Sequence, residues 1–324
     1  MHVVACLGGF AAFEHETGGM KRLFALLLLV VFATAPAGAQ TVTLHIGTTP
    51  TDTGAQVYYA MDLGLFKKAG FEVEVSSLNA GNAISTAVSA GSFDIGQSAV
   101  SSLALAYLHG IPFVIIAPGG AYSSKLPTSE LIVAKNSPIT KASDLVGKIV
   151  AVNALKSITS IAVDAWLDAN GVKPDSVKFV ELPFTETAVA LNSGRIDAAF
   201  ISEPSLGAAL QSGARIIGHP YDAIAPDFLI SAWYTTADYA KTHPDIVRKF
   251  AAIMAEAGTW ANAHQSESAA ILQKYTKVEN TGTMRRITYV NRLVPAQVQP
   301  LIDASAKYGV TDKTFPATDL FAFH

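Results

Sequence analysis

Cysteine is nearly absent from this chain of 324 residues, because the one cysteine, Cys6, falls in a segment that we expect to be removed. A chain that starts after it has no thiol, which excludes disulfides, a cysteine metal site and a cysteine nucleophile. Charged residues are also scarce, at 15%, and the net charge is −3, with no cluster of lysine or arginine. This balance argues against a nucleic-acid partner and gives no sign of an electrostatic membrane patch.

A long hydrophobic run is missing as well. The apolar run from Leu23 to Phe32 is shorter than the ~20 residues that span a bilayer. Lys21 and Arg22 precede it and Ala37-Gly38-Ala39 follows it, which is the pattern of a secretory signal peptide cleaved before Gln40. We therefore expect residues 1–39 to be an N-terminal extension and signal peptide, with Met20 as an alternative start. The mature protein is predicted to be periplasmic and not attached to lipid, since no cysteine follows the cleavage site.

Sequence motifs of catalysis are also lacking. The chain contains no GxxxxGK[ST], HExxH or GxSxG, and no paired-glycine dinucleotide loop follows the first predicted strand. The histidines are dispersed without metal-ligand spacing. We therefore expect neither enzymatic turnover nor a cofactor nor a metal site.

Short apolar strands alternate with amphipathic helices along the mature chain. "VTLHIG" at 42–47 is followed by turn residues and a helical pattern, and strand and helix patterns then alternate through "IPFVIIAPG" at 111–119. A second series begins at "KIVAVN" at 148–153. This order predicts an α/β fold with parallel-rich sheets and helices on both faces. The length suggests about two domains.

One segment is written twice, as "AVSAGSFDIG" at 87–96 and "ALNSGRIDAA" at 190–199. In both, a helix is expected to end at a glycine, Gly91 or Gly194, that adopts the left-handed cap conformation. The aspartates Asp94 and Asp197 then begin a strand and are predicted to be structural, as acceptors of amide hydrogen bonds. Ligands should bind at the opposite, carboxyl ends of the strands, where helices begin.

Four stretches resemble bacterial periplasmic solute-binding proteins of ABC transporters, of the class that binds nitrate, taurine, aliphatic sulfonates and thiamine-pyrimidine precursors. They are "MDLGLFKKAGFEVEV", "AGNAISTAVSAGSFDIG", "NSPITKASDLVGKIVAV" and "ETAVALNSGRIDAAFISEP". The resemblance implies a type II periplasmic binding protein fold, in which two α/β lobes joined by two chain crossings close on a small molecule. It also implies a monomer that delivers its ligand to a membrane permease with a cytoplasmic ATPase. The alternative is an enzyme on the same fold, similar to a thiamine-pyrimidine synthase or a menaquinone-pathway dehydratase.

The lobes are predicted from the order of the patterns. Residues 40–130 would form the first part of lobe 1, 131–228 lobe 2, and 229–324 the return to lobe 1 and a helical tail. The crossings are expected at 129–136 and 227–236.

Candidate ligand contacts are the polar residues at strand ends and helix starts. They are Thr49, Asp52, Thr53, Gln56, Asn79, Gly81, Asn82, Gln97, Ser98, Ser123, Asn153, Lys156, Ser157, Thr159, Thr185, Glu186, Glu203 and Trp233. Several have structural alternatives: Asp52 or Thr53 as a helix cap, Glu203 as a partner of a helix dipole, and Trp233 as a core residue. Lys156 stands where members of the resembled family often have glycine.

The ligand itself is left open by these residues. The candidate loops contain carboxylates at Asp52, Glu186 and Glu203, candidate cations at Lys156 and Lys125, and no arginine. An oxyanion such as nitrate or a sulfonate would use amides, hydroxyls and a cation, whereas a pyrimidine would use carboxylates and an aromatic platform. The acidic set favours an aromatic or heterocyclic ligand slightly.

Overall fold

The computed structural model describes residues 41–277, 282 and 284–322. The predicted signal peptide and Cys6 lie outside the described residues. From Val42 onward the chain forms one compact unit. No helix in the described ranges has both the length and the apolar character needed to cross a bilayer.

The first five-stranded sheet carries lobe 1, with the strand order β2-β1-β3-β12-β4. Its strands are β1 (Val42–Thr48), β2 (Phe71–Ser77), β3 (Ile95–Ala99), β4 (Phe113–Pro118) and β12 (Ser231–Thr236). The first three strands are parallel, and β12 runs antiparallel between β3 and β4. The predicted parallel-rich sheet is therefore present, with one reversed strand supplied by the returning chain.

The second five-stranded sheet carries lobe 2 and repeats this connectivity, with the order β10-β6-β9-β7-β8. Its strands are β6 (Ser129–Val133), β7 (Ile149–Val152), β8 (Lys178–Glu181), β9 (Ala198–Ser202) and β10 (Arg215–Gly218). Here β7, β8 and β9 are parallel, and β6 is the reversed strand between β9 and β10. In each lobe, the strand that enters from the crossing is thus inserted antiparallel at the same place.

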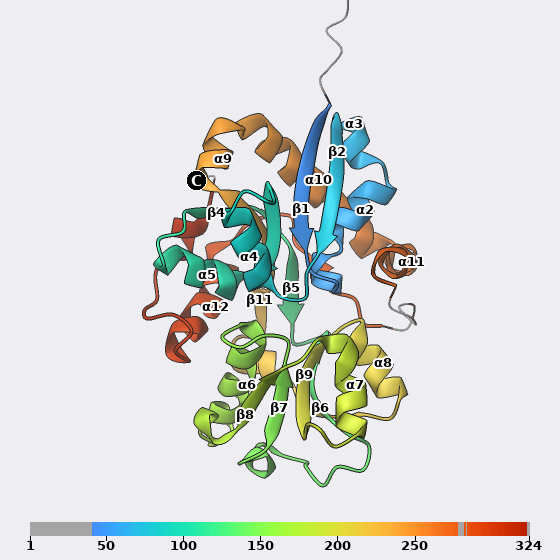
Figure 1. The fold of residues 1–324 in the computed structure, drawn as a ribbon, viewed down its shortest axis with the longest axis vertical. Helices are drawn as coiled ribbons and strands as arrows, with labels where there is room; N and C mark the ends of the chain where they lie inside the picture. Colours follow the sequence, from blue (N-terminus) through green and yellow to red (C-terminus); the bar gives the residue numbers. More distant parts are fainter. Residues whose placement is uncertain (1–40, 278–281, 283, 323–324) are drawn as a thin grey trace, which may run out of the picture. The chain divides into compact units, whose positions relative to one another are not determined.

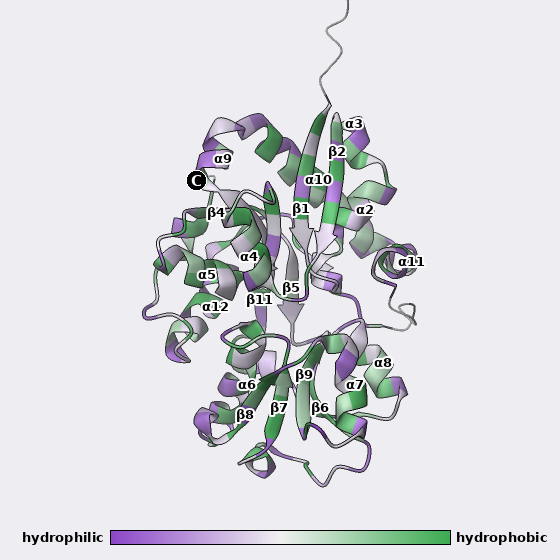
Figure 2. Cartoon of the chain, viewed as in Figure 1, coloured by the Kyte–Doolittle hydropathy of each residue, from purple (hydrophilic) through white to green (hydrophobic). Residues whose placement is uncertain are grey.

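Helices cover both faces of each sheet (Figure 1). Lobe 1 has α2 (Gln56–Asp62), α3 (Leu65–Lys68), α4 (Gly81–Ser89) and α5 (Val100–Leu108), and lobe 2 has α6 (Ile158–Ala169), α7 (Phe184–Asn192) and α8 (Ser205–Gln211). The inner strands β7 and β9 of lobe 2 are mostly hydrophobic, as Figure 2 shows, and largely buried, whereas β1 and β2 also carry polar, exposed residues. One face of the second sheet packs on α7 and α8 as a separate apolar cluster. Its other face, under α6, belongs to a core that continues into lobe 1.

A small third sheet, in the order β11-β5-β13, joins the lobes. The outgoing crossing is β5 (Gly120–Ser123), the return is β11 (Asp227–Leu229), and the tail adds β13 (Thr288–Tyr289). The return predicted at 227–236 begins at β11 but extends through β12 of the lobe 1 sheet, and the first crossing was placed too late. Residues Ser129–Val133 are all buried and pair with β9, so this apolar run is a strand of the lobe 2 sheet.

The repeated glycine–aspartate segment has the predicted structural role. Gly91 and Gly194 have φ values of 74° and 69° after the ends of α4 and α7. The Oδ2 atom of Asp94 accepts a hydrogen bond from the amide of His45 in β1, at 2.8 Å. The Oδ2 atom of Asp197 accepts one from Ile149 in β7, also at 2.8 Å. Each aspartate therefore ties its strand to the parallel strand beside it, β1 or β7, whereas we expected turn amides as the donors.

The C-terminal tail is helical, with α9 (Ala237–Thr242), α10 (Pro244–Ala263), α11 (Gln265–Thr276) and α12 (Pro295–Lys307). Phe250, Ile253 and Met254 are buried on one face of α10, as their spacing predicts. At the other end of the tail, α12 packs against α5, β11 and α6. The exposed pair between Lys307 and Asp168 of α6 has a distance of 2.9 Å. The tail therefore contacts both lobes and the strand that joins them.

Candidate ligand-binding site

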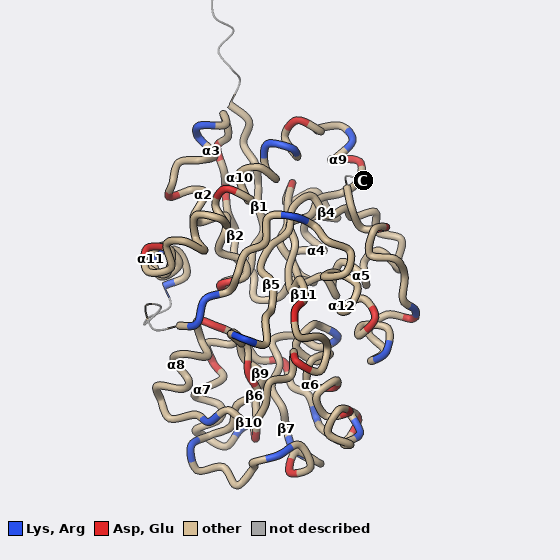
Figure 3. The backbone as a smooth tube through the Cα atoms, turned by 180° about the vertical axis from the view of Figure 1, so that it is seen from behind, with Lys and Arg blue, Asp and Glu red and all other residues tan. Residues whose placement is uncertain are grey.

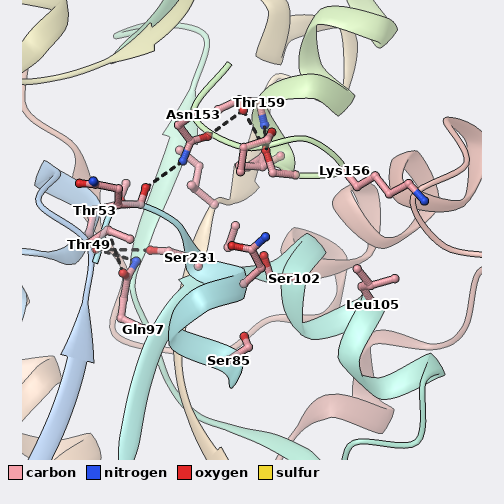
Figure 4. Close-up of a pocket in the computed structure, with 18 of the residues that line it drawn as sticks. Thr49, Thr53, Ser85, Gln97, Ser102, Leu105, Asn153, Lys156, Thr159 and Ser231 are labelled. Carbon is pink, nitrogen blue, oxygen red and sulfur yellow. Dashed lines mark hydrogen bonds between the residues drawn. The ribbon is translucent and has the colours of Figure 1, made fainter. Parts of the chain in front are cut away.

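A cavity of about 790 Å³ lies between the lobes and is lined by residues of both. In lobe 1 these residues follow β1 and β3 and begin α4, and in lobe 2 they follow β7 and begin α6 and α7. Figure 4 shows residues of both sets around it. The lobes also touch directly here, since Nδ2 of Asn153 donates to the carbonyl of Asn79 at 3.3 Å. The cavity is therefore at the carboxyl ends of the strands, where the fold predicts a ligand.

Lobe 1 presents a chain of hydroxyl groups to the cavity. Thr49 donates to Oε1 of Gln97 at 3.0 Å, and Thr51 lies 2.9 Å from Thr49 and 2.8 Å from Thr53, oxygen to oxygen. Each hydroxyl has one proton, and Thr49 uses its proton on Gln97, so Thr51 donates to Thr49 and Thr53 donates to Thr51. A ligand that accepts the Thr53 proton would therefore replace Thr51 as its partner.

Lobe 2 presents the loop between β7 and α6. The Thr159 hydroxyl donates to Oδ1 of Asn153 at 2.8 Å, and the Ser157 hydroxyl accepts from the Thr159 amide at 3.3 Å as the N-cap of α6. Between them, Lys156 has a φ of 49°, in the left-handed region that favours glycine. Figure 4 shows the Lys156 side chain extending away from the Asn153–Thr159 bond. A non-glycine residue in this conformation carries backbone strain, a feature often found at functional loops.

Helix starts converge on the cavity. Its lining includes Gly81 at the start of α4, Ala99 before α5, Ile158 at the start of α6 and Phe184 at the start of α7. The amides of a first helical turn lack helical partners and carry the positive end of the helix dipole. Among the described residues that line the cavity, none is Asp, Glu or Arg, and Lys156 is the cation. The electrostatics of this site therefore favour a negatively charged ligand.

Most of the predicted contact residues line this cavity. They are Thr49, Thr53, Asn79, Gly81, Asn82, Gln97, Asn153, Lys156, Ser157 and Thr159. Close packing explains why position 81 is a glycine. A Cβ atom at Gly81 would lie 2.1 Å from the Ser98 hydroxyl oxygen. Ser98 itself is fully buried beneath Gly81, and its Oγ has no hydrogen-bond partner in the described part of the chain. It supports the wall from behind and does not line the cavity.

Asp52, Gln56 and Trp233 do not line the cavity, because each is used in the core of lobe 1. The Asp52 carboxylate accepts two hydrogen bonds from the Arg286 guanidinium, at 2.9 and 3.1 Å, and one from the amide of Ile287 at 2.7 Å. Gln56 accepts the Trp233 indole proton at 2.8 Å, and both side chains are fully buried. The core alternative for Trp233 is therefore the observed one.

The remaining predicted residues also lie elsewhere. Ser123 ends β5 in the crossing sheet, Thr185 and Glu186 lie in the first turn of α7, and Glu203 is buried after β9. Glu186 is exposed and lies 3.9 Å from Arg195 at the surface. We therefore remove these residues from the proposed ligand set. The sequence favoured a heterocyclic ligand because of the carboxylates Asp52, Glu186 and Glu203, and none of the three lines the cavity.

Glu203 and Glu130 are buried carboxylates at the junction between lobe 2 and the tail. Burial raises the pKa of Glu203 to about 7, while amide hydrogen bonds from Gly207 and Arg285 oppose the rise. Burial also raises the pKa of Glu130, against the effects of His219 at 2.6 Å and the Arg285 side chain at 2.9 Å. Figure 3 shows segments of both charge signs together between α8 and β5. Arg285 thus ties the tail to lobe 2, next to the Arg286–Asp52 pair that ties it to lobe 1.

The sequence did not single out several parts of the cavity wall. They are Ser85, Thr86, Ser89, Ala90, Ala99, Ser102, Leu105, Ala106, His109, Ile111, Ser129, Ala154, Leu155, Ile158, Ser202, Tyr221, Ile230 and Ser231. Thr51 and Phe184 also line the cavity, and both lie in the segments where the sequence predicted ligand contacts. The residues from Ser85 to Ile111 lie on α4, α5 and the segments after them, and their helical spacing gave no signal of a cavity.

Comparisons with known proteins place the chain in a family. Residues 53–268 match the model of the family described as NMT1/THI5 like. The chain belongs to this family. It is 29% identical over 224 residues to the taurine-binding periplasmic protein of Escherichia coli, covering 69% of this chain and 68% of that protein. The resemblance seen in the sequence is thereby confirmed.

Solved structures confirm the type II binding-protein fold. The periplasmic aliphatic sulphonate binding protein SsuA from Escherichia coli has a TM-score of 0.69 and 21% identity, over 86% of this chain and 91% of that one. The desulfurization enzyme DSZB has a TM-score of 0.64 and 16% identity, over 87% and 96% of the two chains. At these identities the likeness shows the fold alone, and the same fold supports both a binding protein and an enzyme.

Proposed function

We propose that this protein is the extracytoplasmic, periplasmic solute-binding component of an ABC importer. It captures a small organic anion in the cavity between the lobes and, as a monomer, delivers it to a membrane permease with a cytoplasmic ATPase. Family membership and the similarity to a taurine-binding periplasmic protein support the transport role.

One observation carries the assignment of an anion. The described lining combines the starts of α4, α5, α6 and α7 with hydroxyl and amide groups and Lys156, and it contains no carboxylate. A cation in this cavity would face several positive helix ends without a counter-charge, whereas a sulfonate or carboxylate group would be stabilised by those helix ends and by hydroxyl and amide groups. Among the ligands considered from the sequence, the sulfonates now fit best.

The mechanism follows from the two lobes and their joining strands. Rotation about a few residues beside β5 and β11 opens and closes the cavity, as in other hinged binding proteins. A ligand shifts this balance only if it binds the closed form better than the open one. Contacts from both lobes meet that condition, because Thr53 of lobe 1 and Asn153 of lobe 2 can contact the same ligand only in the closed form.

A thermal-shift screen tests the anion assignment. The mature protein is heated with taurine, longer sulfonates, nitrate, aliphatic and aromatic carboxylates, and neutral pyrimidines. We expect organic anions to raise the melting temperature, since a ligand at 100 times its Kd stabilises the fold by about 2.7 kcal/mol. Stabilisation by pyrimidines and by no anion would contradict the proposal.

The structural neighbour with enzymatic activity makes turnover the second candidate function. The described lining contains no cysteine and no carboxylate that could act as a nucleophile or a base. We expect a bound sulfonate to be recovered unchanged after prolonged incubation, as measured by mass spectrometry. Release of sulfite or sulfate in proportion to protein and time would establish an enzyme instead.

A further inference from the structure

Three buried carboxylates lie next to residues that line the cavity. Asp52 belongs to the loop after β1, which contributes to the lining from lobe 1. In lobe 2, Glu130 follows Ser129 along the chain, and Glu203 follows Ser202. Both serines line the cavity, and their hydroxyl oxygens lie 2.7 Å apart. A change in the charge of one of these carboxylates therefore acts directly on the cavity wall.

One segment of the tail connects these carboxylates across the two lobes. Arg286 pairs with Asp52 of lobe 1 at 2.9 Å, and its neighbour Arg285 pairs with Glu130 of lobe 2, also at 2.9 Å. Three residues further on, β13 pairs with the crossing strand β5. The charged segments of this junction lie together in Figure 3. The tail thus forms a bridge between the lobes beside the cavity.

Glu203 is bound to this bridge without a cation of its own. Among the described residues, no lysine, arginine or histidine side chain forms an ion pair with it. Its Oε1 atom accepts a hydrogen bond from the Arg285 amide at 3.2 Å, and its Oε2 atom accepts one from the Gly207 amide at 2.9 Å. Burial disfavours its ionised form, and the nearby charge of Asp52 adds to this effect, while the charge of Arg285 opposes it.

The other titratable groups of the cluster do not balance this charge. His219 is half-exposed and lies 2.6 Å from Glu130, so it serves that carboxylate. Tyr59 and Tyr289 donate hydrogen bonds to Asp52 and stay protonated, because burial raises the pKa of both hydroxyls. A proton on Glu203 is therefore the direct way to remove the uncompensated negative charge.

The burial of Glu203 depends on how the lobes are placed. Gly207, which donates to Oε2, belongs to α8 of the same lobe. The donor to Oε1 belongs to the tail, which Arg286 fixes to lobe 1. When lobe 2 rotates away from lobe 1, this second contact is lost and water reaches the carboxyl group. Water stabilises the ionised form, so the open protein favours a charged Glu203 and the closed protein a neutral one.

We propose that Glu203 is a positioning residue that links closure of the lobes to the uptake of a proton. Its neutral form lets lobe 2 pack against the tail, and its ionised form favours the open protein. This inference rests on the proposed function for the ligand and the closing motion. Because the closed form holds the proton more tightly, ligand affinity is highest at low pH and is lost as the pH rises through 7.

Calorimetry with a ligand of constant charge tests the link. The probe is the sulfonate with the largest effect in the thermal-shift screen, because a sulfonate stays ionised between about pH 5.5 and 8. We expect the affinity to be about fivefold or more higher at the acidic end. At pH 7, titrations in two buffers of different ionisation enthalpy should show net proton uptake on binding. A purely structural role of Glu203 would produce neither result.

Three variants assign the proton. Glu203→Gln is neutral at every pH, so its affinity should no longer depend on pH and should match that of the wild type at low pH. His109→Gln removes the histidine of the described lining and should keep the pH dependence, whatever its effect on affinity. Glu186→Gln changes an exposed carboxylate outside the cavity and should behave as wild type.

Several outcomes would overturn the inference. One is a pH dependence that persists in Glu203→Gln or disappears in His109→Gln. If Glu203→Gln does not fold, the proton uptake of His109→Gln decides: uptake supports the link, and its absence refutes it. Sulfonate binding without proton uptake would refute the link and leave the transport proposal standing. If no organic anion binds, both the link and the proposed function are wrong.

Discussion

The two lobes share their framework and differ at the edge that faces the ligand. Both sheets have the same connectivity, and Asp94 and Asp197 make the same 2.8 Å bond to the parallel neighbouring strand, β1 or β7. At the opposite edge, α4 of lobe 1 opens with the small residues Gly81 and Asn82, whereas α7 of lobe 2 opens with Phe184. The repeated segment therefore marks the structural edge of each sheet, and the edge that binds ligand is where the repeats diverge.

The lobes also hold their ligand loops by different means. In lobe 1 the loop after β1 depends on the buried Asp52–Arg286 pair, which reaches into the tail. In lobe 2 the loop after β7 is held locally, by the N-cap Ser157 and by Glu181, which accepts a hydrogen bond from the Leu155 amide at 2.7 Å. The ligand loop of lobe 1 thus depends more on long-range contacts than the ligand loop of lobe 2. Substitutions in the two loops can compare how much each set of contacts contributes to stability.

The largest expected effect is the loss of the buried pair in lobe 1. Asp52→Ala leaves the Arg286 guanidinium buried without its partner, so the free energy of unfolding should fall by about 3–5 kcal/mol. The matched change in lobe 2, Glu181→Ala, removes one exposed hydrogen bond and should cost about 1 kcal/mol or less. Urea denaturation measures both. Equal losses in the two variants would show that the loops are held equally.

The next effect is the pH dependence that Glu203 confers. Its pKa of about 7 in the folded protein is above the ordinary value, so the folded state holds this proton more tightly than the unfolded state. Stability from this group is therefore present at low pH and is lost as pH rises toward and through 7. Between pH 5.5 and 8, wild type should lose about 2 kcal/mol more than Glu203→Gln in chemical denaturation. Identical pH profiles would mean that the carboxyl titrates normally.

The two strand ties should be equivalent. Asp94→Ala and Asp197→Ala each remove one acceptor of a strand amide at a partly exposed position, so each should lower the free energy of unfolding by about 1–2 kcal/mol. Ligand affinity should be unchanged in both, because these residues lie at the edge away from the cavity. Chemical denaturation measures the free energy of unfolding, and calorimetry measures the ligand affinity. A weaker affinity in only one of the two variants would show that the two aspartates are not equivalent.

The smallest effect is expected at the strained residue of lobe 2. Lys156→Gly relieves a left-handed backbone conformation at a φ of 49°, so it should stabilise the protein by about 0.5–1 kcal/mol. The same change removes the cation of the described lining and should weaken the binding of an organic anion. Chemical denaturation of the variant measures the change in stability, and calorimetry measures the change in anion affinity. Lower stability together with unchanged affinity would show that Lys156 has a structural role.

The sequence predicted the fold well because its signals are local. Alternating strand and helix patterns, and the glycines at Gly91 and Gly194, depend on neighbours within a few residues. The first crossing was misplaced because a buried strand, Ser129–Val133, and an extended linker have the same apolar pattern. Asp52 was misinterpreted because its partner, Arg286, is distant in the sequence, and no local pattern reports such a pair.

The candidate site was predicted only where it lies at strand ends. Thr49 and Asn153 follow strands and Gln97 lies inside β3 near its carboxyl end, so the topology of a parallel sheet places them together. The cavity wall formed by α4 and α5 was not predicted, because Leu105 on a mostly apolar helix is indistinguishable in sequence from a core residue. Glu186 follows Thr185, the residue that aligns with Asn82 in the repeat, but the turn of α7 directs it to the surface beside Arg195.

Closure of both lobes on one anion is the central claim, and calorimetry on three variants tests it most directly. Thr53→Val removes a hydroxyl donor of lobe 1, Asn153→Ala removes an amide donor of lobe 2, and Glu186→Gln changes an exposed charge outside the cavity. With the best-stabilising anion from the screen, the first two variants should each bind about tenfold or more weakly, and Glu186→Gln should bind as wild type. Normal binding by either Thr53→Val or Asn153→Ala would contradict a ligand held between the two lobes.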